Sequence, residues 1–161
     1  MATPGIIISA PTSGAGKTTI TLGILRALRD KGLNVSAAKI GPDYIDSKFH
    51  ERASSGRCVN LDTWGMNKPQ LQYLASETSK DSDIFVIEGV MGLFDGAPQP
   101  GEISNGSTAS AALELGIPII LVIDASSQAQ SVAALASGFL NHDKQLNFAG
   151  VILNRVSSER H

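Results

Sequence analysis

The chain has 161 residues, with 13 lysines and arginines against 15 aspartates and glutamates and a single cysteine, Cys58. Such a balanced charge offers no broad basic surface to a nucleic-acid backbone or an anionic membrane, so we expect small-molecule partners, no nucleic acid and no membrane. A lone cysteine excludes an internal disulfide, and no apolar run longer than residues 117–123 is present to span a bilayer, so we expect a cytoplasmic chain without a signal peptide.

Short apolar runs alternate with longer segments of helical periodicity along the chain. Five such runs predict strands, and four of them are nearly continuous in Ile, Val, Leu or Phe, as expected for strands that are covered on both faces of a sheet. They lie at residues 6–9, 35–40, 84–87, 119–123 and 149–153. Because helices connect parallel strands, the alternation predicts an α/β fold of three layers with a mostly parallel central sheet.

Four segments between or after these runs predict helices. The first, residues 17–31, places its apolar side chains on one face and is followed by Gly32, a favourable C-terminal stop. Residues 41–62 and 92–106 do not fit this pattern and are expected to form long loops, which in compact domains are usually functional or mobile. The remaining helices are predicted at residues 69–79, 108–115 and 128–140.

A glycine-rich segment, Ala-Pro-Thr-Ser-Gly-Ala-Gly-Lys-Thr-Thr at residues 10–19, lies between the first predicted strand and the first predicted helix. Glycines on either side of Ala15, at Gly14 and Gly16, let the backbone amides turn towards phosphate oxygens, and the helix adds its free N–H groups and the positive end of its dipole. The segment departs from the pattern G-x-x-x-x-G-K-[ST] only at Pro11, which stands in place of the first glycine. It therefore predicts a phosphate-binding loop.

The residues that follow this loop have the side chains that a nucleotide needs. Lys17 is expected to reach the β- and γ-phosphates, Thr18 to coordinate Mg²⁺, and Thr19 to add a hydroxyl near the α-phosphate. The alternative is a glycine-rich turn with a solvated lysine, but the strand before the loop and the helix after it favour a nucleotide. We predict ATP or GTP binding, with ATP and Mg²⁺ as the cofactors.

Acidic residues follow three predicted strands, at the edge where open α/β sheets bind ligands. Asp43 and Asp46 follow the second strand, and each is a candidate to hold Mg²⁺ directly or through water. Glu88 follows the third strand and is the favoured magnesium ligand, with Asp95 further along a glycine-rich loop. Since Mg²⁺ prefers one or two carboxylates, some of these acids should face substrate. Asp124, after the fourth strand, is weighed equally as a ligand and as a helix cap.

Two further polar residues have both a functional and a structural interpretation, and the histidines and two aromatic residues have only a structural one. Asn154 follows the last strand, where its amide can read a purine edge or serve in a turn. Lys39 can meet an anionic substrate or pair with a neighbouring aspartate. The histidines lack metal-binding spacing and are expected at the surface, and two aromatic residues are expected to pack. These residues are His50, His142 and His161, and Tyr44 and Trp64.

Three further segments carry a more specific pattern than the phosphate loop. They are Lys-Ile-Gly-Pro-Asp-Tyr-Ile-Asp at 39–46, Asn-Leu-Asp at 60–62 and Glu-Gly-Val-Met-Gly-Leu-Phe-Asp-Gly at 88–96. With them the chain resembles the cobyrinic acid or hydrogenobyrinic acid a,c-diamide synthases over nearly its whole length. Ser47 stands where that family usually has proline. The resemblance implies a P-loop NTPase fold similar to that of dethiobiotin synthetase.

The resemblance also implies a ligase of cobalamin biosynthesis. Such an enzyme uses ATP and Mg²⁺ to phosphorylate the a- and c-carboxylates of a corrinoid, and then replaces the phosphate with ammonia drawn from glutamine. Its motifs assign the phosphates to Lys17, the metal to Thr18, Asp46 and Glu88, the substrate carboxylate to Asp43 and Asp46, and the orientation of substrate to Asp95.

Members of that family are longer and carry a C-terminal glutaminase domain with a cysteine nucleophile on a sharp turn. Cys58 lacks such a turn and is interpreted as a structural thiol. Residues 157–161 follow a predicted strand without a closing helix, so we expect residues 1–161 to be the ATP-binding domain of a longer protein and to lack glutaminase activity. The expected partners are a corrinoid, the glutaminase domain and, as in relatives, a second copy in a homodimer.

Two other functions fit the phosphate loop. One is a partitioning or switch-type P-loop ATPase, many of which carry a lysine early in the loop, where this chain has Thr12. The other is a ligase like dethiobiotin synthetase, which activates a small carboxylic acid. The sequence does not distinguish a cobalt-bearing corrinoid from a metal-free one.

Overall fold

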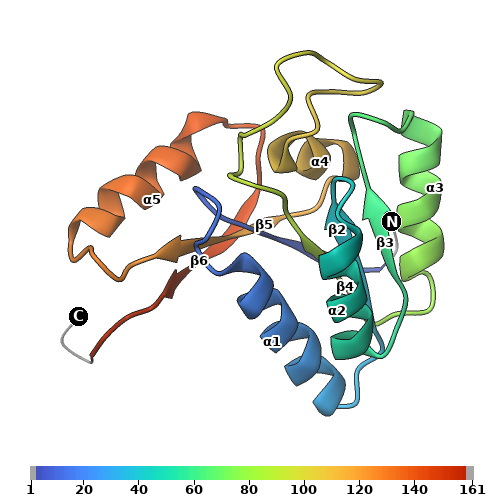
Figure 1. Ribbon diagram of the computed structural model, residues 1–161, viewed down its shortest axis with the longest axis horizontal. Coiled ribbons are helices and arrows are strands. Elements are labelled where there is room, and N and C mark those ends of the chain that lie inside the picture. The colour runs from blue at the N-terminus through green and yellow to red at the C-terminus, as the bar shows by residue number, and fades with distance from the viewer. Residues whose placement is uncertain (1–2, 159–161) are drawn as a thin grey trace.

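The computed structural model describes residues 3–158 and contains a six-stranded sheet with helices on both faces (Figure 1). The strands are β1 (Gly5–Ser9), β2 (Val35–Ile40), β3 (Cys58–Leu61), β4 (Ile84–Glu88), β5 (Ile119–Asp124) and β6 (Phe148–Asn154). The helices are α1 (Lys17–Asp30), α2 (Tyr44–Ser54), α3 (Lys68–Ser79), α4 (Thr108–Leu115) and α5 (Ser131–His142). Within the described residues, no helix is long and apolar enough to cross a membrane.

The strands lie in the order β3-β2-β4-β1-β5-β6, and every neighbouring pair is parallel. The carboxyl ends of β2, β4 and β1 therefore lie side by side at one edge of the sheet. In open α/β sheets this edge is where ligands bind. The predicted α/β fold with a parallel central sheet between helices is confirmed.

Two apolar cores join the sheet to its helices. Ile8 and Val86 belong to the core under α1 and α2, whereas Ile7, Phe85 and Ile87 belong to the core under α3, α4 and α5. Because successive side chains of a strand point to opposite faces, central strands such as β1 and β4 need nearly continuous apolar sequence. Full burial of one such side chain contributes about 1.5–3 kcal/mol relative to exposure.

The expectation of a loop at residues 41–62 is wrong, because α2 and β3 lie within it. The buried positions of α2 are Ser47, His50 and Ser54, so the helix lacks the apolar stripe from which helices are recognised in a sequence. β3 contains only four residues, of which one is an asparagine. Residues 92–106 contain neither helix nor strand, as expected.

β6 differs from the other four predicted strands because it lies at the edge of the sheet. Its residues alternate between partly buried and exposed, and Val151 and Leu153 are exposed. It is therefore not covered on both faces. The helix predicted over residues 128–140 spans Ser131–His142 as α5, and none of its residues is buried.

The expectation that Tyr44 and Trp64 pack is also wrong, since 77% and 49% of their surfaces are exposed. Trp64 instead makes polar contacts with the loop at residues 92–106. Its indole N–H donates to the Gln99 carbonyl at 3.2 Å, and its own carbonyl accepts from the Glu102 N–H at 2.8 Å. Trp64 thus fixes the path of this loop from outside the cores.

A core substitution tests the assignment of β4 as a central strand. Phe85→Ala removes a fully buried ring and is expected to lower the free energy of unfolding by about 3–5 kcal/mol in urea denaturation. The control Tyr73→Ala, on the exposed face of α3, should change it by less than about 0.5 kcal/mol. Equal effects would contradict the burial of β4.

Candidate functional site

One cavity of about 350 Å³ lies at the carboxyl edge of the sheet, beside the N-terminus of α1. It brings together residues from α1, β2, β4 and the segments that follow β1, β2 and β4. Most of the residues predicted for phosphate, metal and substrate binding are in its lining. The lining residues are Ser13, Gly14, Gly16, Lys17, Thr18, Thr19, Lys39, Asp43, Asp46, Glu88, Val90 and Met91.

The glycine-rich loop ends at an uncapped helix. α2, α3 and α4 have an N-cap side chain that bonds to the helix, whereas α1, whose N-cap is Gly16, and α5 have none. Gly16 has a φ of 99°, in the left-handed region that favours glycine. The first N–H groups of a helix have no partner within the helix, so the start of α1 is open to an anion.

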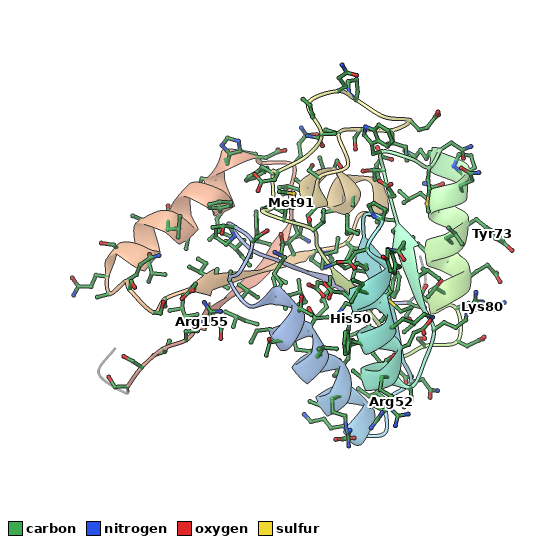
Figure 2. All side chains as sticks on the ribbon, viewed as in Figure 1. His50, Arg52, Tyr73, Lys80, Met91 and Arg155 are labelled. Atoms are coloured by element: carbon green, nitrogen blue, oxygen red, sulfur yellow. The ribbon has the colours of Figure 1, made fainter. Side chains whose placement is uncertain are left out.

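Lys17 is buried behind this loop, with its ammonium at the cavity. Its Nζ donates a hydrogen bond of 2.6 Å to the Met91 carbonyl, which follows β4 (Met91 is labelled in Figure 2). Met91 has a φ of 45°, uncommon for a residue with a side chain, which marks the turn as constrained. Burial lowers the pKa of Lys17, and the nearby Lys39 lowers it further, against the opposing effect of Glu88. The ammonium is thus held in a largely desolvated place, where a bound phosphate would stabilise its charge.

Thr18, Lys39, Asp46 and Glu88 form a polar cluster in the lining of the same cavity. Lys39 Nζ lies 3.0 Å from both Asp46 Oδ2 and Glu88 Oε1. The Thr18 hydroxyl donates to Glu88 Oε1 at 2.6 Å and lies 3.4 Å from Asp46 Oδ2. Of the two roles predicted for Lys39, contact with an anionic substrate and pairing with a neighbouring aspartate, the structure shows the pairing with aspartate.

The charges of this cluster stabilise one another. Burial raises the pKa of Glu88, but its contacts with His50, Lys39 and Thr18 outweigh burial and leave the pKa below its ordinary value. Burial likewise lowers the pKa of Lys39, but Glu88 and Asp46 raise it above the ordinary value. Both groups are therefore charged at neutral pH, and the cluster presents fixed carboxylate oxygens to the cavity.

Asp43 also has a structural function, because it caps α2. Its Oδ1 accepts from the N–H groups of Ile45 and Asp46 at 3.0 and 3.1 Å. The Asn60 amide, on β3, donates to the carbonyls of Gly41 and Asp43 at 2.6 and 2.9 Å. Asn60 thus fixes the turn that carries Asp43 and leads into α2, where Asp46 lies. Asp43 Oδ2 lies 3.8 Å from Lys39 Nζ, at the mouth of the cavity.

Asp95, Asn154 and Asp124 lie outside the cavity lining. Asp95 Oδ2 accepts from the Gly92 N–H at 2.9 Å and so closes the turn after Met91. Asn154 Nδ2 donates to the Ala15 carbonyl at 2.9 Å, which braces the phosphate loop from behind. Asp124 accepts from the Ser126 N–H at 2.9 Å and pairs with Arg155, as a turn residue does.

The expectation that His50 lies at the surface is wrong. His50 is fully buried under α2, and its Nε2 lies 2.7 Å from Glu88 Oε2. Its position four residues after Asp46 would have placed both side chains on one helix face, had α2 been recognised. His142 is exposed as expected, and its ring contacts Phe94 edge-on with ring centres 4.6 Å apart. His161 lies outside the described residues.

Cys58 lies at the start of β3, and its Sγ is 3.9 Å from Nδ1 of His50. Burial raises the pKa of its thiol to about 12. Since the thiolate is the nucleophile, such a cysteine is inert at neutral pH. This agrees with its interpretation as a structural thiol.

The donor set of the cavity fits magnesium that arrives with a nucleotide. Across residues 3–158, no group of three or more His, Cys, Asp or Glu side chains is arranged to hold a metal ion. Thr18, Asp46 and Glu88 nevertheless offer one hydroxyl and two carboxylates next to the phosphate loop. Mg²⁺ usually takes one or two carboxylates and completes its shell with phosphates and waters.

Comparison with known families places the chain. Residues 6–161 match the model of the CobQ/CobB/MinD/ParA nucleotide binding domain. The chain belongs to this family. It is therefore a nucleotide-binding domain, which agrees with the phosphate loop and the open N-terminus of α1.

Curated relatives give a more specific likeness. The chain is 49% identical to hydrogenobyrinate a,c-diamide synthases of Mesorhizobium japonicum, over 100% of the chain, and of Rhodobacter capsulatus, over 98%. It is 47% identical to that of Streptomyces coelicolor over 99%. The predicted resemblance is thereby confirmed. The chain spans only 36%, 36% and 32% of the length of these three relatives.

Solved structures share the fold at low sequence identity. Chloroplast FtsY from Physcomitrella patens aligns with a TM-score of 0.62 and 16% identity, over 95% of this chain and 50% of that one. The kinase domain of the Escherichia coli tyrosine kinase ETK aligns with a TM-score of 0.61 and 13% identity, over 99% and 70%. This likeness confirms the P-loop NTPase fold and carries no information on substrate.

A pair of glycine substitutions tests the shape of the phosphate loop. In Gly16→Ala the new Cβ would lie 2.3 Å from Asn154 Nδ2, at a φ that strains any side chain. We expect a loss of about 1–3 kcal/mol in unfolding free energy, with loss of nucleotide binding. Gly23→Ala, in open space within α1, should instead stabilise by up to about 1 kcal/mol and keep nucleotide binding. Urea denaturation and nucleotide titration measure both, and equal behaviour of the two variants would contradict the loop geometry.

The lowered pKa of Glu88 predicts a pH dependence. A carboxylate with a depressed pKa in the folded state contributes stability above its unfolded pKa, and this contribution is lost as the pH falls through the folded pKa. Below about pH 4, wild type should therefore lose more unfolding free energy than Glu88→Gln does. Asp81→Asn, which changes an exposed acid, serves as the control and should follow wild type in urea denaturation. Parallel curves for wild type and Glu88→Gln would show that Glu88 is not a charged, paired group.

Proposed function

We propose that the chain is the ATP-binding domain of a hydrogenobyrinate or cobyrinate a,c-diamide synthase, an ATP- and Mg²⁺-dependent amidoligase of cobalamin biosynthesis. One observation carries the proposal. Lys17, Thr18, Asp46 and Glu88 line a single cavity. The chain that contains it is 49% identical, over 98–100% of its length, to proteins named hydrogenobyrinate a,c-diamide synthase.

The cavity is suited to hold the triphosphate of ATP. The backbone of Gly14, Ala15 and Gly16 and the start of α1 would bind phosphate oxygens, with Thr19 near the α-phosphate. Lys17 would place its ammonium on the β- and γ-phosphates. Mg²⁺, when bound by Thr18, Asp46 and Glu88, would neutralise charge on the phosphates. Asn154, behind the loop, would contact the purine with the part of its amide not used by Ala15.

The proposed chemistry needs an activated carboxylate, because a carboxylate ion is a poor electrophile. A corrinoid carboxylate oxygen attacks the γ-phosphorus, the bond to the β-phosphate oxygen breaks, and ADP leaves. Ammonia then attacks the carbonyl carbon of the acyl phosphate, inorganic phosphate leaves, and an amide remains. Lys17 would stabilise the charge on the transferred phosphoryl group, the main way in which such sites accelerate transfer.

The substrate carboxylate would enter at the mouth of the cavity. Asp43 lies there on the turn that Asn60 fixes, and Asp46 lies in the first turn of α2, with Lys39 partly neutralising both carboxylates. Asp95 would orient substrate through the turn that it closes at Gly92. The positions of Lys39, Asp43 and Asp46 in the lining of the cavity support this entry for the substrate.

The partners proposed here follow from the longer relatives. The ammonia source would be a glutaminase domain of a parent protein, and a homodimer would complete the substrate site. The parent would work in the cytoplasm on a corrinoid, cobalt-bearing or metal-free.

Calorimetric titration with ATP and Mg²⁺ tests the nucleotide part of the proposal. Lys17→Ala removes a charged donor to phosphate. Because a hydrogen bond to a charged group contributes about 1.5–3 kcal/mol, ATP binding is expected to weaken about 10- to 100-fold. Glu88→Gln should weaken binding in the presence of Mg²⁺ and not in its absence. The exposed Lys31→Ala is the control and should bind as wild type does.

Phosphate release then tests the ligase itself. Hydrogenobyrinic or cobyrinic acid should stimulate phosphate release by wild type and not by Lys17→Ala. ATP binding without any response to either corrinoid would contradict the amidoligase and favour a switch-type ATPase. No ATP binding at all would contradict both.

A further inference from the structure

The buried face of α2 is polar where helices that cover a sheet are usually apolar. Ser47, His50 and Ser54 occupy it. Ser47 and Ser54 donate to carbonyls one turn back in their own segment, at 2.8 and 2.9 Å, so their hydroxyls are satisfied locally. The His50 side chain (labelled in Figure 2) instead contacts Glu88, the last residue of β4. A buried polar ring costs free energy unless it finds a partner, so this position demands an explanation.

The partner of His50 is one specific oxygen of Glu88. Nε2 lies 2.7 Å from Glu88 Oε2, and the two side chains are 0% and 1% exposed. Among the described residues, neither of these buried atoms forms a hydrogen bond of standard geometry, so the 2.7 Å contact pairs two polar atoms that are otherwise unsatisfied. Thr18 and Lys39 both contact the other oxygen, Oε1, at 2.6 and 3.0 Å. The two oxygens of one carboxylate are thus divided between the cavity and α2.

We propose that His50 is a positioning residue, which holds Glu88 Oε2 so that Oε1 faces Thr18 and the magnesium site. The inference rests on the proposed function, since it concerns the carboxylate assigned to the metal. His50 does not line the cavity, and it acts only through Glu88.

The physical need for such a residue comes from the freedom of a glutamate side chain. The terminal torsion of Glu has a broad, roughly two-fold preference, so packing alone does not fix the plane of the carboxylate. With nothing on Oε2, the nearby Lys39 ammonium could attract either oxygen and turn Oε1 away from Thr18. Groups that orient a metal-binding carboxylate or histidine in this way typically contribute 10–100-fold to metal affinity.

Substitutions at His50 test the inference by their effect on magnesium dependence. His50→Gln keeps an amide N–H that can reach Oε2, whereas His50→Leu fills similar space without a donor. The Mg²⁺ concentration that gives half-maximal ATP affinity should rise about 10-fold or more in His50→Leu and less than about 3-fold in His50→Gln. ATP affinity in the presence of a magnesium chelator should be the same in wild type and both variants.

Two controls separate positioning from a general loss of stability. Leu71→Ala opens a cavity under α3, far from the cluster, and should lower stability without changing the magnesium dependence. His142→Gln makes the same chemical change at an exposed histidine and should have no effect. If His50→Leu does not fold, His50→Asn takes its place, since its amide is too short to reach Oε2 and should show the same rise.

The outcomes distinguish this inference from the proposed function. Wild-type magnesium dependence in His50→Leu or His50→Asn, with loss of that dependence in Glu88→Gln, would overturn the positioning role and leave the metal site intact. Unchanged magnesium dependence in Glu88→Gln would overturn the metal site itself. An equal rise in His50→Gln and His50→Leu would show that shape rather than the N–H donor is required, and would also overturn the inference.

Discussion

The Glu88 carboxylate is a charge buried at the end of the central strand β4, and the arrangement of the site follows from the need to stabilise it. Removing such a charge from water costs several kcal/mol unless partners surround it. Its partners come from three elements: Thr18 from α1, Lys39 from β2 and His50 from α2. These elements can therefore assemble only in one mutual position without leaving an unpaired charge. The phosphate loop, which leads into α1, is fixed by the same constraint.

The sequence predicted the parts of the site that depend on local rules. The phosphate loop has its own spacing, and Asp43, Asp46 and Glu88 follow strands whose carboxyl ends must meet in a parallel sheet. His50 was missed because its helix, α2, buries serine and histidine rather than an apolar stripe, and so escaped recognition. The contact of Asn154 with the Ala15 carbonyl joins positions 139 residues apart, which no spacing rule gives, whereas Asp95 closes a local turn at Gly92.

Two of the segments that carried the family resemblance line the cavity together with the phosphate loop. Residues 39–46 supply Lys39, Asp43 and Asp46, and residues 88–96 supply Glu88 and Met91. The fold is shared with FtsY and a tyrosine kinase domain at 13–16% identity, so the sheet and the helices alone do not specify a substrate. Any specificity for the proposed carboxylate substrate would therefore lie in these two segments, where Asn60 from the adjacent β3 fixes the first and the Gly92–Asp95 contact fixes the second.

The hydrogen bond from Lys17 to the Met91 carbonyl bears on the thermodynamics of binding. Fixing a long lysine side chain costs up to about 1.5–2 kcal/mol of conformational entropy. Here folding has already restricted the side chain, and an ammonium with three N–H groups can keep one on the carbonyl while it offers the others to phosphate. The entropy cost thus lowers the stability of the folded chain rather than the affinity for nucleotide. The left-handed backbone of Met91 lowers that stability further. A nucleotide then meets a lysine that is already in place, so more of the free energy of contact appears as affinity.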